Sequence, residues 1–246
     1  MRFFIELSYN GTNYHGWQVQ PNANTVQAEI NKALSTILKT KIEVAGAGRT
    51  DSGVHAKQMF AHFDYDNEFD FQNTIIKLNS FLANDIAVCS FFKVRCEASS
   101  RFDALNRIYH YNIIQYKSPF KKRAYFVHKL LDVKQMNLAC QYLLGKQDFT
   151  SFSKANTQTF TNNCNVMLAS WQWQGDELIF KIKADRFLRN MVRAIVGTLL
   201  EVGVGKIKAE QVKEIIAQND RSMAGTSVPA NALFLFEIEY PKDIFI

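Results

Sequence analysis

Residues 46–56 have the sequence Gly-Ala-Gly-Arg-Thr-Asp-Ser-Gly-Val-His-Ala. Three glycines, Gly46, Gly48 and Gly53, allow backbone conformations that other residues avoid, and they surround the charged residues Arg49 and Asp51. Short strands fit the apolar residues on both sides, over 42–47 and 58–63. The pattern predicts a loop between two strands that presents a carboxylate. A tight surface turn with an Arg–Asp pair is the structural alternative.

The elements around this loop have a clear order in the first half of the chain. Apolar residues alternate from Phe3 to Tyr9 and predict a strand that ends at the Asn10-Gly11 turn. Helical spacing begins at Val26, after Asn24 or Thr25 as N-cap, and again after the possible cap Asp70. With a strand over 86–94, the first half is predicted to be β-α-β-β-α-β.

The second half has almost the same order of elements. Its predicted elements are a strand over 107–116, a helix over 133–144, strands over 164–173 and 177–186, helices over 188–202 and 209–217, and a strand over 233–240. Each half can form a ferredoxin-like (RRM-like) unit, and two such units can join their sheets. We expect an α+β protein with a joined, mainly antiparallel sheet and a central cleft. Residues 1–104 would form an N-terminal lobe with the Asp51 loop, and residues 105–246 a C-terminal lobe.

Composition narrows the class of protein. The chain has 246 residues, with 29 basic and 23 acidic ones, and its net charge of +6 suggests a polyanionic partner or simply a solvated surface. Its four cysteines form no C-x-x-C pair and no His-Cys cluster, so no metal site is expected. An acidic residue, Glu6, comes too early for a signal peptide, and no run approaches the roughly 18 apolar residues of a membrane span. We expect a cytoplasmic protein that does not insert into a membrane.

The triplet Asp51-Ser52-Gly53 also matches the D-[ST]-G signature of aspartic proteases. Such proteases need two aspartates that share a proton. This chain has one such triplet and long helical patterns, which do not fit an all-β protease. The protease interpretation is therefore rejected.

The whole loop resembles the G-x-G-R-T-D-x-G-V-H-A signature of the TruA family of tRNA pseudouridine synthases. The resemblance covers nearly the whole chain. It includes residues 9–18 (YNGTNYHGWQ), 25–27 (TVQ), 101–104 (RFDA), 107–111 (RIYHY), 148–152 (DFTSF) and 187–193 (FLRNMVR). Several such strings in family order are much more specific than one.

The resemblance implies a pseudouridine synthase fold with an RNA-binding cleft, and it implies a catalytic activity on tRNA. The family isomerises uridine to pseudouridine in the anticodon stem-loop of tRNA, at nucleotides 38, 39 and 40. Because the reaction adds no atoms, no cofactor is expected, and one ionised carboxylate, Asp51, is enough as nucleophile. The family also implies a homodimer. A non-catalytic tRNA-binding or RNA-folding protein is the alternative.

Four further residues are candidates for the substrate pocket. Asp51 needs a nearby cation or donors to stay ionised in a closed pocket. The candidates are Arg49, two residues away, and Arg189, which the resemblance implies through the family's F-L-R-x-M-V-R motif. For Arg49, a phosphate or loop-carbonyl contact is an equal alternative. The family motif places its active-site tyrosine at Tyr109, where the ring could stack on the extracted uracil. The motif also places Leu233 on the pocket wall, although a core leucine is the simpler interpretation.

Other residues are candidates for contacts with RNA. Arg101 belongs to one of the family strings, and Arg193 would share a helical face with Arg189, four residues before it. A loop cluster of Lys117, Lys121, Lys122 and Arg123 would either attract RNA or only aid solubility. Two other residues are predicted to be structural: Tyr111 as core, and His55 as a histidine bonded to the backbone.

Three positions depart from the family pattern. Ser52 stands where alanine is usual, Asn231 lies in a string that is usually A-P-A-H-G-L, and no arginine occurs at Asn163-Cys164-Asn165. These changes put one RNA contact and the pocket rim in doubt. They do not affect Arg49, Asp51, Tyr109 or Arg189.

Overall fold

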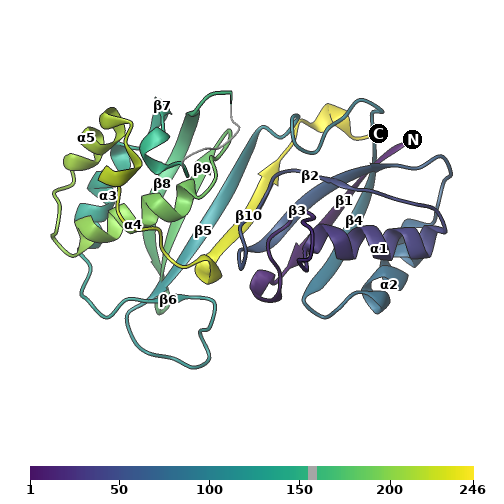
Figure 1. The fold of residues 1–246 in the computed structure, drawn as a ribbon, viewed down its shortest axis with the longest axis horizontal. Helices are drawn as coiled ribbons and strands as arrows, with labels where there is room; N and C mark the ends of the chain where they lie inside the picture. The colour runs from purple at the N-terminus through teal and green to yellow at the C-terminus, as the bar shows by residue number, and fades with distance from the viewer. Residues whose placement is uncertain (155–159) are drawn as a thin grey trace. The chain divides into compact units, whose positions relative to one another are not determined.

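The computed structural model describes residues 1–154 and 160–246. They form two compact units, which Figure 1 shows with the chain coloured from purple to yellow. The first unit consists of Met1–Leu105 and Leu235–Ile246, and the second of Asn106–Phe234. The first unit is thus made from both ends of the chain. A strand that begins in one unit, Leu233–Glu239, continues into the other.

The first unit has the strand order β4-β1-β3-β10, and β2 pairs with β3. Its elements are β1 (Arg2–Tyr9), α1 (Val26–Leu38), β2 (Ala45–Gly46), β3 (His55–Asp64), α2 (Phe71–Phe81), β4 (Ile86–Val94) and β10 (Leu233–Glu239). The central strand β1 pairs antiparallel with both β3 and β4. The observed order β-α-β-β-α-β over residues 2–94 confirms the prediction.

Local sequence explains the ends and the packing of these elements. The side chain of Asp70 accepts a hydrogen bond from the amide of Asn73, so it caps α2 as predicted. Phe3 on β1 lies 5.7 Å from Phe63 on β3 and 5.0 Å from Phe69, measured between ring centroids. Aromatic rings at such distances pack the core of this unit beneath α2.

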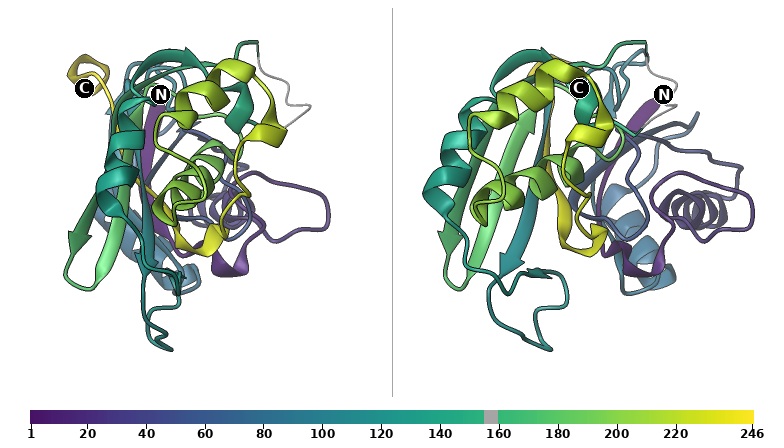
Figure 2. Two further views of the ribbon diagram at one scale, coloured as in Figure 1. Left: turned by 90° about the vertical axis from the view of Figure 1, so that its left-hand side faces the viewer. Right: turned by 60° about the vertical axis from the view of Figure 1, so that its left-hand side comes forward.

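The second unit has the strand order β5-β9-β8-β7, and β6 pairs with β5. Its elements are β5 (Asn106–Ile114), β6 (Tyr125–Phe126), α3 (Val133–Gln141), β7 (Gly145–Asp148), β8 (Asn163–Gln174), β9 (Glu177–Ala184), α4 (Met191–Gly203) and α5 (Gln211–Gln218). The pairings β5–β9, β8–β9 and β7–β8 are antiparallel, and β5–β6 is parallel. Figure 2 shows α4 and α5, in lime green, on one side of these strands.

The α+β class with a mainly antiparallel sheet is confirmed, and several boundaries differ from the prediction. The strand expected over 42–47 covers only Ala45–Gly46, and the helix expected from 188 begins at Met191. Asn190 has φ +67°, a left-handed conformation that cannot continue a helix towards the N-terminus. The short strands β6 and β7 were not predicted. Within the described residues, no helix is long and apolar enough to span a membrane.

Candidate active site

The loop between β2 and β3 carries Asp51. The amide of Val54 donates to the carbonyl of Asp51 at 3.2 Å, which closes a turn around Ser52 and Gly53. Gly53 has φ +80°, a conformation that favours glycine at this position. Arg49 and Ser52 are exposed, whereas Asp51 is half-buried. The loop thus presents the carboxylate at a partly sheltered position.

Residues 9–17 hold this loop in place through hydrogen bonds to residues 50–53. On one side of Asp51, the hydroxyl of Tyr9 lies 2.9 Å from that of Thr50. On the other side, the carbonyl of Tyr14 accepts hydrogen bonds from the Gly53 amide at 3.2 Å and from the Ser52 hydroxyl at 3.3 Å. The residues before and after Asp51 are therefore both held by one segment.

Two glycines allow that close approach. A Cβ on Gly11 would lie 2.0 Å from the carbonyl oxygen of Val54, and a Cβ on Gly16 would lie 2.2 Å from that of Thr50. Gly16 also has φ +87°. No side chain fits between these backbones, so the glycines of the YNGTNYHGWQ string serve to seat the Asp51 loop.

Tyr14 and Trp17 fix the supporting segment in turn. The Tyr14 hydroxyl donates to Asp85 at 2.6 Å, and Asn13 also bonds that carboxylate at 3.1 Å. Burial and then the Asp85 carboxylate raise the pKa of Tyr14, so the phenol keeps its proton. The buried Trp17 lies 6.2 Å from the Tyr9 ring. Sequence reasoning missed Tyr9, Tyr14 and Asp85 as supports, although Gly11 and Gly16 were a usable signal.

His55 is a structural residue, as predicted. It is 1% exposed, and its Nδ1 accepts a hydrogen bond from the Gly11 amide at 3.0 Å. A ring nitrogen that accepts a hydrogen bond carries no proton, so Nδ1 is the accepting nitrogen of this ring. His55 therefore links β3 to the supporting segment.

Arg49 makes no hydrogen bond or ion pair with other residues that the structure describes. It is exposed beside Asp51 on the same loop. This position favours the alternative in which Arg49 contacts a phosphate over direct support of the Asp51 carboxylate.

The second unit contains Tyr109 on β5. Tyr109 is half-buried, and its ring meets that of Phe187 edge-to-face, with centroids 5.0 Å apart and an interplanar angle of 83°. Tyr111 is fully buried, and its hydroxyl donates to the carbonyl of Pro229 at 2.9 Å. Tyr111 is confirmed as a core residue, and Tyr109 is less buried than Tyr111.

Arg189 and Arg193 do not share a helical face, which corrects the prediction. Arg189 lies in the turn before α4, is exposed, and accepts a hydrogen bond at its carbonyl from the Lys154 amide. Arg193 lies in the first turn of α4, and its Nε donates to the carbonyl of Val228 at 2.7 Å. The helix starts too late for the four-residue spacing to apply, and Arg193 also holds the segment before β10.

Leu233 and Arg101 are the remaining candidates. Leu233 begins β10 and is 5% exposed. Arg101 is exposed in the turn after β4, with its guanidinium carbon 5.2 Å from the centre of the Phe102 ring. The structure thus places Arg49, Asp51 and Arg101 in the first unit, and Tyr109, Arg189, Arg193 and Leu233 in the second.

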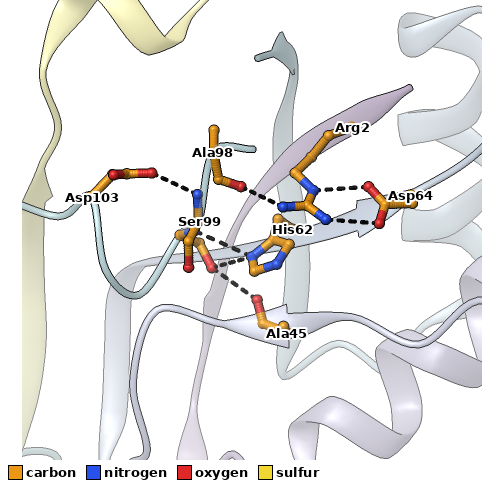
Figure 3. Close-up of polar contacts among 8 residues, drawn as sticks. Arg2, Ala45, His62, Asp64, Ala98, Ser99 and Asp103 are labelled. Carbon is orange, nitrogen blue, oxygen red and sulfur yellow. Dashed lines mark hydrogen bonds and ion pairs between the residues drawn. The ribbon is translucent and has the colours of Figure 1, made fainter. Parts of the chain in front are cut away.

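A polar network holds the turn that carries Arg101, and Figure 3 shows it. The amide of Ser100 donates to Nδ1 of His62 at 3.2 Å, and the Ser100 hydroxyl donates to the Ala45 carbonyl at 2.8 Å. Arg2 pairs with Asp64 through two hydrogen bonds of 2.8 Å and also donates to the Ala98 carbonyl. The turn is therefore tied to β1, β2 and β3.

Among the described residues, no group of three or more His, Cys, Asp or Glu side chains could hold a metal ion. The chemistry available at the Asp51 loop is that of a single carboxylate on a rigid support. Such a group can act as a nucleophile or a base without a partner carboxylate on the same loop.

A family model and three relatives of this chain agree in their descriptions. A family model described as tRNA pseudouridine synthase matches residues 139–241. The chain is 52% identical over 248 residues to tRNA pseudouridine synthase A of Bacteroides thetaiotaomicron, covering 99% of this chain and 92% of that protein. The enzymes of the same name from Porphyromonas gingivalis and Francisella tularensis subsp. novicida are 47% and 37% identical. These matches cover 100% and 99% of this chain, and 99% and 95% of the relatives.

Proposed function

Because this chain belongs to the tRNA pseudouridine synthase A family, we propose that it isomerises uridine to pseudouridine in tRNA, with Asp51 as nucleophile. The protein is then an intramolecular transferase among the isomerases. The observation that carries the assignment of Asp51 is its support. The residues on both sides of it are bonded to the segment 9–17, and the carboxylate remains half-buried.

The reaction needs one bond broken and one bond made. The bond between uracil N1 and ribose C1′ breaks, the base turns, and C5 bonds to C1′, while C5 loses a proton and N1 gains one. A transient covalent bond to Asp51, on the ribose or on the base, would keep the two fragments together. A rigid loop keeps the carboxylate oriented towards the substrate through both steps.

The other site residues receive roles that fit their chemistry. Tyr109 would stack on the uracil taken out of the RNA helix, and Leu233 would contact the same base. Arg189 would favour the ionised form of Asp51, and Arg49 would bind a phosphate. Arg101 and Arg193 would contact the RNA backbone, with Arg193 also holding Val228.

The substrate is proposed to be the anticodon stem-loop of tRNA, at nucleotides 38, 39 and 40, as the family resemblance implies. We further propose that the protein acts in the cytoplasm as a homodimer, which light scattering of the purified protein would test. A mass of one chain at working concentration would contradict the dimer.

The decisive experiment measures tritium released from tRNA labelled at uridine C5, because only C5 loses hydrogen in this reaction. Asp51→Asn should bind tRNA normally and release no tritium, since an amide is a poor nucleophile. Asp66→Asn, which changes an exposed carboxylate of the same unit, is the matched control and should retain activity. Wild-type protein that binds tRNA without product would instead support a non-catalytic RNA-binding protein. Full activity of Asp51→Asn would overturn the assignment of Asp51.

A further inference from the structure

Most of the net positive charge of this chain lies in one loop. The segment of residues 115–131, which follows β5 and ends just before Asp132, the N-cap of α3, includes five basic residues and no acidic one. We call it the basic loop. Since the whole chain has 29 basic and 23 acidic residues, the rest is nearly balanced, at 24 against 23. Five charges of the same sign within 17 residues are typical of a surface that binds a polyanion.

The basic loop has a defined conformation, although it contributes little to the core. β6 pairs with β5 within it, and the Val127 amide donates to the Ile114 carbonyl at 2.9 Å. Gln115 donates to the Lys129 carbonyl at 2.8 Å, and Asn231 donates to the Lys122 carbonyl at 3.0 Å. In Figures 1 and 2 the loop extends as a teal segment beyond the end of β5. The backbone that carries its charges is thus held at several points.

Lys121 differs from the other cations of the basic loop. Its ammonium lies 2.9 Å from Asp176 and 2.7 Å from Glu177, in the turn between β8 and β9 and at the start of β9. The Tyr116 hydroxyl also donates to Asp176. The carboxylate of Glu177, and then that of Asp176, raises the pKa of Lys121. Lys121 therefore anchors the loop, and its positive charge is already paired with the carboxylates of Asp176 and Glu177.

Three other cations of the loop have no such partner. Lys117, Lys122 and Arg123 are exposed, and the side chains of these three residues form no hydrogen bond or ion pair with the residues that the structure describes. They lie on both sides of Lys121 along the chain. Their charge is therefore available to an external ligand.

The basic loop also carries an aromatic side chain that is exposed to solvent. Phe120 is 94% exposed, between Pro119 and the anchored Lys121, and its amide donates to the Ser118 hydroxyl at 3.3 Å. An accessible ring among cations is what proteins use to stack on an unpaired base while basic residues contact the phosphates.

We propose that the basic loop is a second tRNA-binding surface, outside the Asp51 loop. Lys117, Lys122 and Arg123 bind backbone phosphates, and Phe120 stacks on an unpaired base. Lys121 is a positioning residue that acts through Asp176 and Glu177. The identity of the RNA as tRNA rests on the proposed function, whereas the preference for a polyanion with unpaired bases rests on the loop itself.

The first test compares the salt dependence of tRNA binding in two triple variants. One changes Lys117, Lys122 and Arg123 to alanine. The control changes three exposed helical lysines, Lys32, Lys77 and Lys213, to alanine and removes the same charge. Each phosphate contact contributes about 0.7–0.9 to the slope of log Kd against log salt, so the loop variant should lose about two to three units of slope. The control variant should keep the wild-type slope. Equal slopes in the two variants would overturn the proposal.

The second test isolates the stacking ring. Phe120→Leu keeps an apolar side chain and removes the aromatic face, whereas Phe120→Trp keeps that face. Phe120→Leu should weaken tRNA binding by about 5- to 100-fold, and Phe120→Trp should bind at least as tightly as wild type. Equal binding by both variants would overturn the role of Phe120.

The outcomes separate this proposal from the proposed function. In the loop variant, KM for tRNA should rise more than kcat falls, because phosphate contacts add binding energy away from the reacting base. Wild-type protein that makes no pseudouridine would overturn the function and leave the binding comparison intact. Charge and an exposed ring also attract anionic membranes. Loop-dependent binding to phosphatidylserine vesicles, with unchanged tRNA affinity, would overturn the RNA assignment in favour of a membrane.

Discussion

The hydroxyl of Tyr9 lies 2.9 Å from that of Thr50, one residue before Asp51. Tyr9→Phe removes this contact and leaves the ring in place. Since one hydrogen bond contributes roughly 0.5–1.5 kcal/mol, kcat should fall by about 2- to 10-fold, with little change in tRNA affinity. Tritium release under saturating tRNA, together with direct binding, measures both quantities.

A double-mutant cycle with Thr50→Val tests whether the two hydroxyls act as a pair. If they do, the double variant should be no slower than the slower single variant. Independent losses that multiply in the double variant would show that Tyr9 affects the rate by another route.

Gly16 offers a second prediction for a single residue. Gly16→Ala must place a Cβ 2.2 Å from the Thr50 carbonyl, at φ +87°. Gly205→Ala is a matched control, because Gly205 has φ +73° and nothing within 4 Å of its Cβ position. In both variants the new alanine must adopt the left-handed conformation, which costs about 1–2 kcal/mol of stability. Only Gly16→Ala also displaces the Asp51 loop. Thermal melting should show the larger loss for Gly16→Ala, and a similar loss for both would contradict the role of the close approach.

The sequence predicted the reactive residue better than its supports. Asp51 could be predicted because three glycines surround it within one short string. Tyr9 and Tyr14 contact the loop from about forty residues away along the chain, and local patterns do not reveal such contacts. Tyr9 follows the strand alternation and looks like a core residue, which it also is, at 4% exposure.

Among the elements, the turn after β4 depends on a histidine. His62 is half-buried, and its Nδ1 accepts from the Ser100 amide at 3.2 Å (Figure 3). Burial first, and then the charge of Arg2, lowers the pKa of His62 below its usual 6.5. The folded protein therefore binds this proton less readily than the unfolded chain. The contribution to stability is present above pH 6.5 and is lost as the pH falls towards the lowered pKa.

His62→Asn tests this dependence, because an asparagine side chain can offer an acceptor to Ser100 and does not titrate. The free energy of unfolding, measured by urea titration at several pH values, should depend less on pH below 6.5 in this variant than in wild type. The exposed His128 provides the control His128→Asn, which should keep the wild-type dependence. An unchanged profile in His62→Asn would exclude His62 as the source.

Element boundaries followed the sequence where a local signal was strong. α2 begins after its cap Asp70, and β4 covers 86–94 as predicted. β6 and β7 were missed because two to four residues are too few to show alternation. The turn before α4 was predicted as helix because its side chains follow helical spacing, and only the backbone conformation of Asn190 shows otherwise.

For the whole molecule, the C-terminus is part of the first unit. Ile244 is fully buried, and Phe245 lies 5.3 Å from Phe92 and 6.2 Å from Phe4 between ring centroids. The Tyr240 hydroxyl donates to the Ser100 carbonyl at 2.5 Å. A boundary between residues 104 and 105 was expected, with the last strand wholly in the second lobe. Alternating residues predict a strand but do not identify its neighbours.

Ile244→Ala should therefore destabilise the first unit by about 2–5 kcal/mol, the usual cost of truncating a buried isoleucine. Ile246→Ala, at a residue that is 78% exposed, should change stability by less than about 0.5 kcal/mol. Hydrogen exchange should accelerate in residues 1–105 of the Ile244 variant more than in residues 106–234. Uniform acceleration over both ranges would contradict a local effect.

The return of the C-terminus also sets the order in which a nascent chain can mature. Residues 1–105 emerge from the ribosome first. At that stage β3 lacks its neighbour β10, and Phe4 lacks the rings of Tyr240 and Phe245. An unpaired strand edge invites wrong partners until it is covered. The part of the gene that is translated first is thus completed last. A product of interrupted translation that ends before Leu235 has the full Asp51 loop in sequence, but not the finished unit that supports it.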